Sequence, residues 1–156
     1  MTTDTIGFSP EEIDPTLATR SARLKWAILV DADLPPGRAT NAAVCVASAT
    51  AARVGGLLGP DAADADGATH PGLPWIGCTV VAATSEQLAT IATKARTSPD
   101  VFVADMPAAG QATRVYAEYL SEVGGRAADD LGHLAHSIVG PRNRIDRLVG
   151  RLPLLP

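Results

Sequence analysis

The chain has few aromatic residues and few cysteines. Only 4% of its 156 residues are aromatic while 46% are hydrophobic, so we expect a core built from Ala, Val, Leu and Ile. Cys45 and Cys78 are the only cysteines, each in an apolar context and neither with a partner at metal-ligand spacing. This pattern argues against a disulfide scaffold and predicts two buried free thiols in a reducing compartment.

A basic excess and long apolar runs are also missing. The formal net charge of -4 weighs against a broad nucleic-acid surface, so tRNA is a disfavoured partner. Four arginines gather near the C-terminal end, where they form either a local basic patch or, more simply, a solvated helix face: Arg142, Arg144, Arg147 and Arg151. No basic-plus-apolar leader and no apolar run of membrane length is present, so we expect a cytoplasmic protein without a membrane partner.

Apolar runs alternate with helical patterns along the chain. The run LKWAILVD has the continuous hydrophobicity of a strand buried on both faces. The predicted strands cover residues 24–31, 75–83, 101–106 and 134–140, and the predicted helices cover 36–57, 85–95, 111–124 and a short stretch after Pro141. This alternation predicts an α/β fold with a mostly parallel sheet.

One domain is expected, because no convincing linker divides the chain. It covers residues 24–156 and follows an N-terminal arm, residues 1–23, which we expect to pack loosely. Ser9 in this arm is placed to cap a short helix. Residues 61–74 contain turn signals throughout and are predicted to form a loop.

The segment DADLPPGRATNAAV joins the first strand to the first helix. Asp31 and Asp33 lie where the strand ends, which is the edge at which open α/β sheets bind ligands. Their spacing allows them to bind a cation together or lets one act as a base. The alternative is that Asp33 caps the helix and Asp31 accepts backbone N–H groups in the turn.

The helix start itself is a candidate anion site. Two prolines remove backbone donors there, but Gly37 permits close approach and Arg38 adds a forked donor. Thr40 and Asn41 add side-chain hydrogen bonds, and Asn41 is unexpected in a helix that otherwise seeks burial. The sequence therefore predicts a site for a small anionic ligand, with a rigid turn as the alternative.

Two further segments carry candidate residues. Gly110, Gln111 and Thr113 follow the third strand and would face the same pocket as Arg38 if the first and third strands end at one edge; the alternative is capping and packing. In the acidic loop, His70 titrates near neutrality and is a catalytic candidate together with Asp31 and Arg38. The loop lacks the later glutamate of a calcium site, and we predict no metal and no cofactor. Of His133 and His136, which flank the fourth strand, one is expected to be structural.

Two long stretches resemble the class II peptidyl-tRNA hydrolases. They are LKWAILVDADLPPGRATNAAVC and IVGPRNRIDRLVGRLPLL, and Gly110-Gln111 resembles the family's Asp-Ala-Gly turn. The order and spacing agree from about Lys25 to Leu155. The resemblance implies a three-layer α/β/α fold with a mixed four-stranded sheet in which one strand is antiparallel.

The chain is more similar still to a bacterial family of unknown function that shares this fold. The similar features are DADLPPGRATNAA, the acidic loop with His70-Pro71-Gly72, the Ala-Gly-Gln-Ala-Thr turn and the Gly-Pro ending.

The resemblance to the hydrolases does not extend to their functional residues. Their lysine pair corresponds to Arg38 and Thr40, a common histidine to Ala47, the glutamine after Ala-Ala to Val44, and the acidic residue of the turn to Ala108. Hydrolysis of the ester needs an activated water and an oxyanion donor, and an arginine cannot serve as the base.

We therefore expect a protein that binds a small anionic molecule. The alternative is a hydrolase of peptidyl-tRNA or another acyl or aminoacyl ester or amide. An Ala-rich small domain is also compatible with a homodimer.

Overall fold

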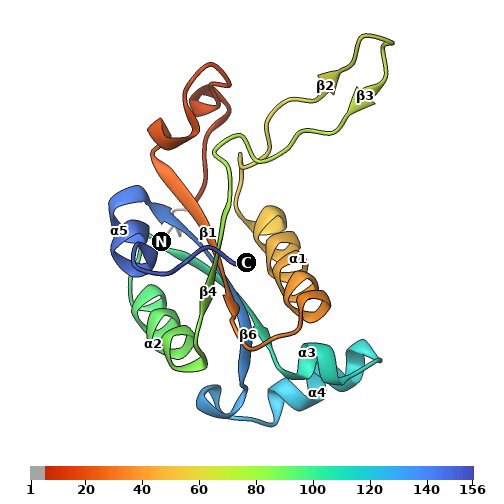
Figure 1. The fold of residues 1–156 in the computed structure, drawn as a ribbon, viewed down its shortest axis with the longest axis vertical. Helices are drawn as coiled ribbons and strands as arrows, with labels where there is room; N and C mark the ends of the chain where they lie inside the picture. The colour runs from red at the N-terminus through yellow and green to blue at the C-terminus, as the bar shows by residue number, and fades with distance from the viewer. Residues whose placement is uncertain (1–5) are drawn as a thin grey trace.

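The central sheet has four strands in the order β4-β1-β6-β5 (Figure 1). The structure is a computed structural model that describes residues 6–156. Strand β1 (Leu24–Asp31) pairs in parallel with β4 (Thr79–Ala83) and antiparallel with β6 (His133–Pro141), and β5 (Phe102–Pro107) pairs antiparallel with β6. The sheet is therefore mixed with one antiparallel strand, as the resemblance implied, and the structure shows that this strand is β6.

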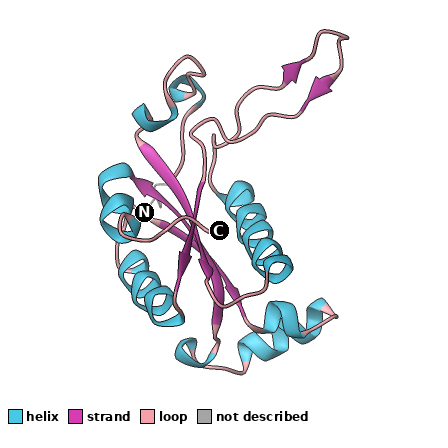
Figure 2. Cartoon of the chain, in the orientation of Figure 1, coloured by secondary structure: helices cyan, strands magenta, loops and turns pink. Residues whose placement is uncertain are grey.

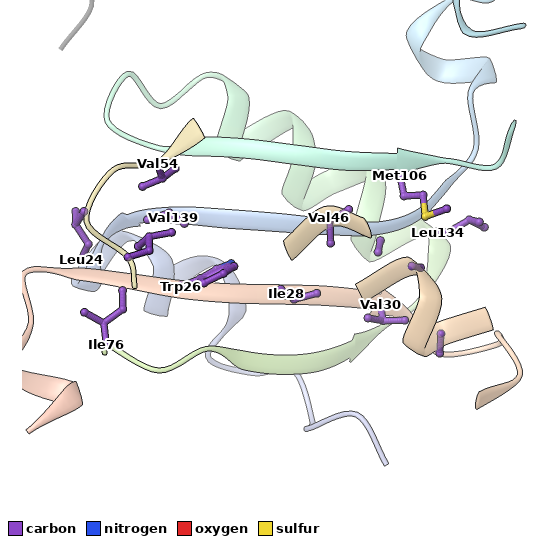
Figure 3. Packing of buried hydrophobic residues seen from close by; sticks show 14 of the residues in the cluster. Leu24, Trp26, Ile28, Val30, Val46, Val54, Ile76, Met106, Leu134 and Val139 are labelled. Carbon is purple, nitrogen blue, oxygen red and sulfur yellow. The ribbon is translucent and has the colours of Figure 1, made fainter. Parts of the chain in front are cut away.

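Helices cover both faces of the sheet (Figure 2). Helix α1 (Pro36–Arg53) packs on one face, and α2 (Ser85–Arg96) with α5 (Arg142–Val149) packs on the other. Alternate side chains of β1 divide between the two faces, since successive strand residues point in opposite directions. Leu24, Trp26, Ile28 and Val30 face α1 (Figure 3), whereas Ala27 and Leu29 face α2 and α5.

Helix α1 ends four residues earlier than the glycines after it suggested. Its buried residues are small or medium and recur at helical spacing: Ala39, Ala42, Val46 and Thr50. Val54 then takes an extended conformation and is buried itself. Gly55 pairs with Gly7 in an isolated bridge, so packing of the N-terminal arm ends the helix at this point.

The N-terminal arm is anchored rather than loose in its described part. Phe8 is buried and lies 4.9 Å from Trp75 between ring centroids. A short 3₁₀ helix follows it, η1 (Pro10–Glu12), with Ser9 in the capping position. A second one, η2 (Thr19–Ser21), leads to β1, and Arg142 of α5 donates to the carbonyl oxygens of Thr19 and Ala22 nearby. One of the four C-terminal arginines therefore has a structural role.

Three other segments differ from the sequence prediction. Residues 61–74 contain a β-hairpin, β2 (Ala62–Ala63) and β3 (Thr69–His70), which projects from the body of the domain (Figure 1). The second strand of the sheet begins only at Thr79, because Gly77 adopts a positive φ in a turn before it. The helix predicted for 111–124 is interrupted: Thr113 is extended, which separates α3 (Ala109–Ala112) from α4 (Tyr116–Gly124).

The last residues of the chain return to the sheet. Ala82 N donates to Pro153 O and Leu155 N donates to Val80 O, so residues 153–155 run along the outer side of β4. A last 3₁₀ helix, η3 (Ala128–Asp130), precedes β6. No helix among residues 6–156 is both long enough and apolar enough to span a membrane.

Candidate functional site

The segment after β1, which contains Arg38, and the segment after β5, which contains Gln111, meet at one edge of the sheet. Strands β1 and β5 both end there, and each leads directly into a helix, α1 or α3 (Figure 1). This edge corresponds to the place where open α/β sheets bind ligands. The hairpin β2–β3 projects from the opposite end of the molecule.

Three predicted site residues form one hydrogen-bonded group, the α1–α3 clasp of Arg38, Asn41 and Gln111. Arg38 Nε donates to Gln111 Oε1 at 2.7 Å. Gln111 Nε2 donates to the carbonyl oxygen of Arg38 at 2.9 Å and to Asn41 Oδ1 at 3.1 Å. The clasp explains why a polar side chain is present at position 41: Asn41 Oδ1 of α1 accepts a hydrogen bond from Gln111 of α3.

Asp31 and Asp33 do not form a pair at this edge. Asp31 Oδ1 accepts a hydrogen bond from the backbone N–H of Asp33 at 3.0 Å, and Asp31 Oδ2 lies 3.3 Å from Ser85 Oγ. Asp31 therefore points to the α2 face. Asp33 is exposed and does not cap α1, whose N-cap is Pro35 without a side-chain hydrogen bond. The prediction of an Asp33 cap was wrong, because the cap position falls two residues later.

Gly37 and Thr40 are exposed in the first turns of α1. A Cβ added at Gly37 would meet no atom within 4 Å, so the space beside it is open to an approaching group. Both residues remain accessible beside the clasp.

A first cleft lies between α1 and α4 on the same face as the clasp. Its volume is about 540 Å³, and Gly110 and Thr113, which flank Gln111, are among its lining residues. The others are Val44, Cys45, Val46, Ser48, Ala49, Asp105, Met106, Arg114, Val115, Tyr116 and Tyr119.

The walls of the first cleft expose large apolar residues to solvent. Val44, Val115 and Tyr116 are 57%, 53% and 73% exposed. Tyr116 and Tyr119 lie 5.3 Å apart between ring centroids, and α4 has no buried residue. Sequence reasoning missed these tyrosines, although two aromatic residues three positions apart are conspicuous in a chain with so few.

The exposed cysteines correct the prediction of buried thiols. Cys45 and Cys78 are both free and exposed, and Cys45 lies on the wall of the first cleft. Small residues around Cys45 suggested burial, but in α1 it lies on the outward side of the buried row formed by Ala42 and Val46.

A second cleft lies on the α2 face, with a volume of about 660 Å³. Polar lining residues include Asp31, Ser85, Arg96, Asp129 and His133. Behind them Asp105 Oδ2 lies 3.2 Å from His133 Nδ1, and Asp105 Oδ1 lies 3.1 Å from Arg96 Nη2. The close contact with His133 Nδ1, with the charge of Arg96, holds the pKa of Asp105 below its usual value against the opposing effect of burial.

His136 lies beneath this cluster and is fully buried. Its ring centroid is 4.9 Å from that of His133. Burial, together with the charge of the neighbouring His133, lowers the pKa of His136 to about 4. Of the two histidines that flank β6, His136 therefore belongs to the interior and His133 borders a cleft.

His70 is separated from both clefts. It lies in β3 of the projecting hairpin, where its Nε2 is 3.1 Å from Asp64 Oδ2. Asp64 Oδ1 also accepts backbone hydrogen bonds from Asp66 and Ala68, so this carboxylate shapes the hairpin turn. The three predicted catalytic residues thus occupy three places: Asp31 the second cleft, Arg38 the clasp and His70 the hairpin. Within residues 6–156, no three His, Cys, Asp or Glu side chains gather in a way that could hold a metal ion.

The fold and its two clefts define an α/β protein with a mixed four-stranded sheet and ligand-sized hollows on both faces. The chain belongs to the family described as "Protein of unknown function (DUF2000)", whose model matches residues 24–156. A solved structure of a protein of unknown function from Agrobacterium tumefaciens strain C58, Atu0240, is similar in fold with a TM-score of 0.77. It is 18% identical, and the match covers 85% of this chain and 97% of that one. No curated protein sequence matches the chain.

Proposed function

We propose that the protein binds a small anionic molecule with an apolar part, and that the first cleft is the binding site. The observation that carries this proposal is the position of Arg114 among the largely apolar residues that line the cleft. Ligand pockets in proteins are typically apolar with a few polar groups that fix orientation. The tyrosines and Val115 would contact the apolar part, and the Arg114 guanidinium would bind the anionic group.

We also propose that the fold is a three-layer fold of the class II peptidyl-tRNA hydrolase type. It is supported by the order of the elements, by the single antiparallel strand and by helices on both faces of the sheet. Authentic peptidyl-tRNA hydrolase activity is not part of it. Thr40, Ala47 and Ala108 replace the lysine, histidine and acidic residue of those enzymes, and the Arg38 side chain donates to Gln111 and cannot act as a base.

The alternative function is hydrolysis of peptidyl-tRNA or another acyl or aminoacyl ester or amide. One observation favours it. His133 borders the second cleft while Asp105 lies behind its Nδ1, and a carboxylate in that position orients an imidazole as a general base. Asp31 lies in the same cleft, whereas His70 lies far outside it. If the protein is a hydrolase, His133 rather than His70 would accept the proton.

Cys45 offers a direct readout of the first cleft. In a Cys78→Ser background, the rate at which a thiol reagent labels Cys45 should fall when the cleft is occupied. We would measure this rate and the melting temperature with octanoate, decanoate and 2-naphthoate, since a ligand of the native state raises its stability. Arg114→Gln should weaken protection about tenfold or more, as expected for the loss of a charge-assisted hydrogen bond. Arg126→Gln, a surface change just after α4, should leave it unchanged.

Two results would contradict the proposal. If none of the three carboxylates slows labelling or raises the melting temperature, the cleft does not bind this class of molecule. If the purified protein turns over peptidyl-tRNA and His133→Gln abolishes turnover, the hydrolase alternative is correct.

A further inference from the structure

The second cleft is separate from the site proposed above. It lies on the α2 face of the sheet, while the first cleft lies on the α1 face, between α1 and α4. The residues that line the second cleft include none from α1 or α4. Asp105 is the residue that connects the two clefts, because it lines the first cleft and contacts Arg96 and His133 of the second.

One part of the second cleft presents hydrogen-bond donors that suit an anion. The carboxylate of Asp105 holds Arg96 through one oxygen and His133 through the other. Arg96 uses only Nη2 in this contact, so other N–H groups of its guanidinium are free to donate to a ligand. His133 has its Nδ1 buried against Asp105, which leaves Nε2 as the ring nitrogen that a ligand can reach. Nε2 accepts a hydrogen bond in the neutral ring and donates one when the ring carries both protons. Arg96 is therefore the permanent donor of this part of the cleft, the protonated form of His133 adds a second donor, and both residues contact one carboxylate.

Another part of the cleft presents acceptors that suit a cation. Asp31 lies at the end of β1 with its Oδ2 beside Ser85 Oγ, and Asp129 lines the cleft from η3. Asp31 is partly buried, and its neighbours within hydrogen-bonding distance are a hydroxyl and a backbone N–H rather than a basic side chain. An ammonium group bound there would supply the positive charge that this carboxylate lacks.

The strand order sets the distance between the two parts. Asp31 belongs to β1 and Asp105 to β5, and both strands pair with β6, which lies between them. Both Asp105 and Leu29 pair with His136, so Asp105 is level with Leu29 and Asp31 lies two residues further along β1. Two strand spacings of about 4.8 Å across the sheet and two residue rises of about 3.3 Å along it separate Asp31 from Asp105 by roughly 12 Å. Allowing about 3 Å for a hydrogen bond at one end or at both leaves about 6 to 9 Å between the charged groups of a ligand. A dipeptide, about 7 Å long when extended, falls within this range.

The walls between these parts carry small side chains. Ala89 and Ala92 of α2 and Ala108 and Ala128 opposite them line the cleft, with Thr93 as a nearby hydroxyl. Small lining residues leave room for the side chains of a ligand and make few contacts that would distinguish one side chain from another. The charges therefore favour recognition of the two ends of the ligand over recognition of its side chains.

From these observations we propose that the second cleft binds a zwitterion of dipeptide length, with its ammonium group at Asp31 and its carboxylate at Arg96 and His133. A ligand with only one of the two charges should bind more weakly, because it would pair with either the acceptors or the donors of the cleft but not with both.

Charge deletion on the ligand tests the proposal. Isothermal titration would compare Ala-Ala with N-acetyl-Ala-Ala, with Ala-Ala amide and with free alanine. Ala-Ala should bind at least tenfold more tightly than each of the other three, because each lacks one charge or the required length. Asp31→Asn should weaken Ala-Ala binding by a similar factor and cause no further loss for the acetylated peptide. Arg96→Gln should show the same pattern with the amide.

Controls separate this result from misfolding and from the first cleft. Arg96→Lys retains the charge next to Asp105 and should bind Ala-Ala better than Arg96→Gln does, and Arg126→Gln should bind it as the wild type does. Labelling of Cys45 should be unaffected by Ala-Ala. The proposal is overturned if Ala-Ala does not bind to the native protein, or if the acetylated and amidated peptides bind as tightly as Ala-Ala.

Discussion

Arg38 and Gln111, 73 positions apart in the chain, hold each other through two hydrogen bonds in opposite directions. Arg38 Nε donates to Gln111 Oε1, and Gln111 Nε2 donates back to the carbonyl oxygen of Arg38. The pair ties the start of α1 to α3 and so fixes one side of the first cleft. Residues predicted as ligand contacts are thus also the residues that position the site.

We expect the two residues to be energetically coupled. Arg38→Ala and Gln111→Ala should each lower the free energy of unfolding by about 0.5–1.5 kcal/mol, since both side chains are accessible to water. In a double-mutant cycle by urea denaturation, the double variant should lose less than the sum of the single losses. If the double variant lost the full sum of the two single losses, the hydrogen bond between the side chains would contribute nothing to stability.

His136 should make folding sensitive to mild acid. Its pKa is about 4 in the folded protein and near 6.5 in the unfolded chain. At a pH between these two values, the unfolded chain binds a proton that the native state does not bind. Stability should therefore fall as the pH drops from about 6.5 towards 4, by up to about 1.4 kcal/mol per pH unit. Asp105, whose pKa is lowered, should add a loss only at still lower pH.

Denaturation midpoints measured from pH 7 to pH 4 would check this. His136→Phe should flatten the dependence, because no buried imidazole then remains to be protonated on unfolding. Ser48→Ala, which changes an exposed residue of α1 that does not titrate, should leave the slope as in the wild type. A slope that persists in His136→Phe would assign the acid sensitivity to other groups.

A buried polar chain crosses the core beneath α1. Trp26 Nε1 donates to Ser137 Oγ at 2.8 Å, the hydroxyls of Ser137 and Thr50 are 2.6 Å apart, and Thr50 Oγ1 donates to Val46 O at 2.7 Å. Ser137→Ala leaves the indole N–H without a partner and should cost about 1–3 kcal/mol of unfolding free energy. Ser48→Ala, on the exposed side of α1, should cost less than about 0.5 kcal/mol.

Gly72 fixes the base of the hairpin. A Cβ at this position would overlap the backbone carbonyl oxygen of Gly59. A backbone atom cannot move aside as easily as the end of a flexible side chain. Gly72→Ala should therefore speed proteolysis within residues 60–72 several-fold and shift the global unfolding midpoint much less, since the hairpin strands have no buried residue. Gly37→Ala is the matched control: with open space around it in the first turn of α1, it should leave proteolysis of the hairpin unchanged.

Local patterns in the sequence were enough to predict most elements of the fold. The strand at Leu24–Asp31 and the helix at Ser85–Arg96 agree with prediction because a continuous apolar run and a capped amphipathic pattern are local signals. The direction of a strand is not a local property, and only the family resemblance indicated that one strand of the sheet is antiparallel. At the break, Thr113 is extended and its hydroxyl donates to Ala109 O, and no Gly or Pro in residues 111–116 signals this interruption.

The candidate site was predictable to a smaller extent. Arg38, Asn41 and Gln111 were singled out, and the structure brings them together because β1 and β5 end at one edge. The cluster around Asp105 was missed, since Arg96 comes from α2 and His133 from β6, and the packing of α2 and the pairing of β5 with β6 bring them to Asp105. Nothing in the local sequence marks Asp105 apart from its position in an otherwise apolar strand.

The C-terminal residues that run along β4 have a consequence for solubility. Strand β4 is an outer strand of the sheet, and an uncovered outer strand offers its backbone amides and carbonyls as a template for another chain. Residues 153–155 occupy part of that row through the hydrogen bonds of Pro153 and Leu155. A chain cut after Leu152 would keep both clefts yet present bare β4 to its neighbours, so aggregation would be the first defect to emerge.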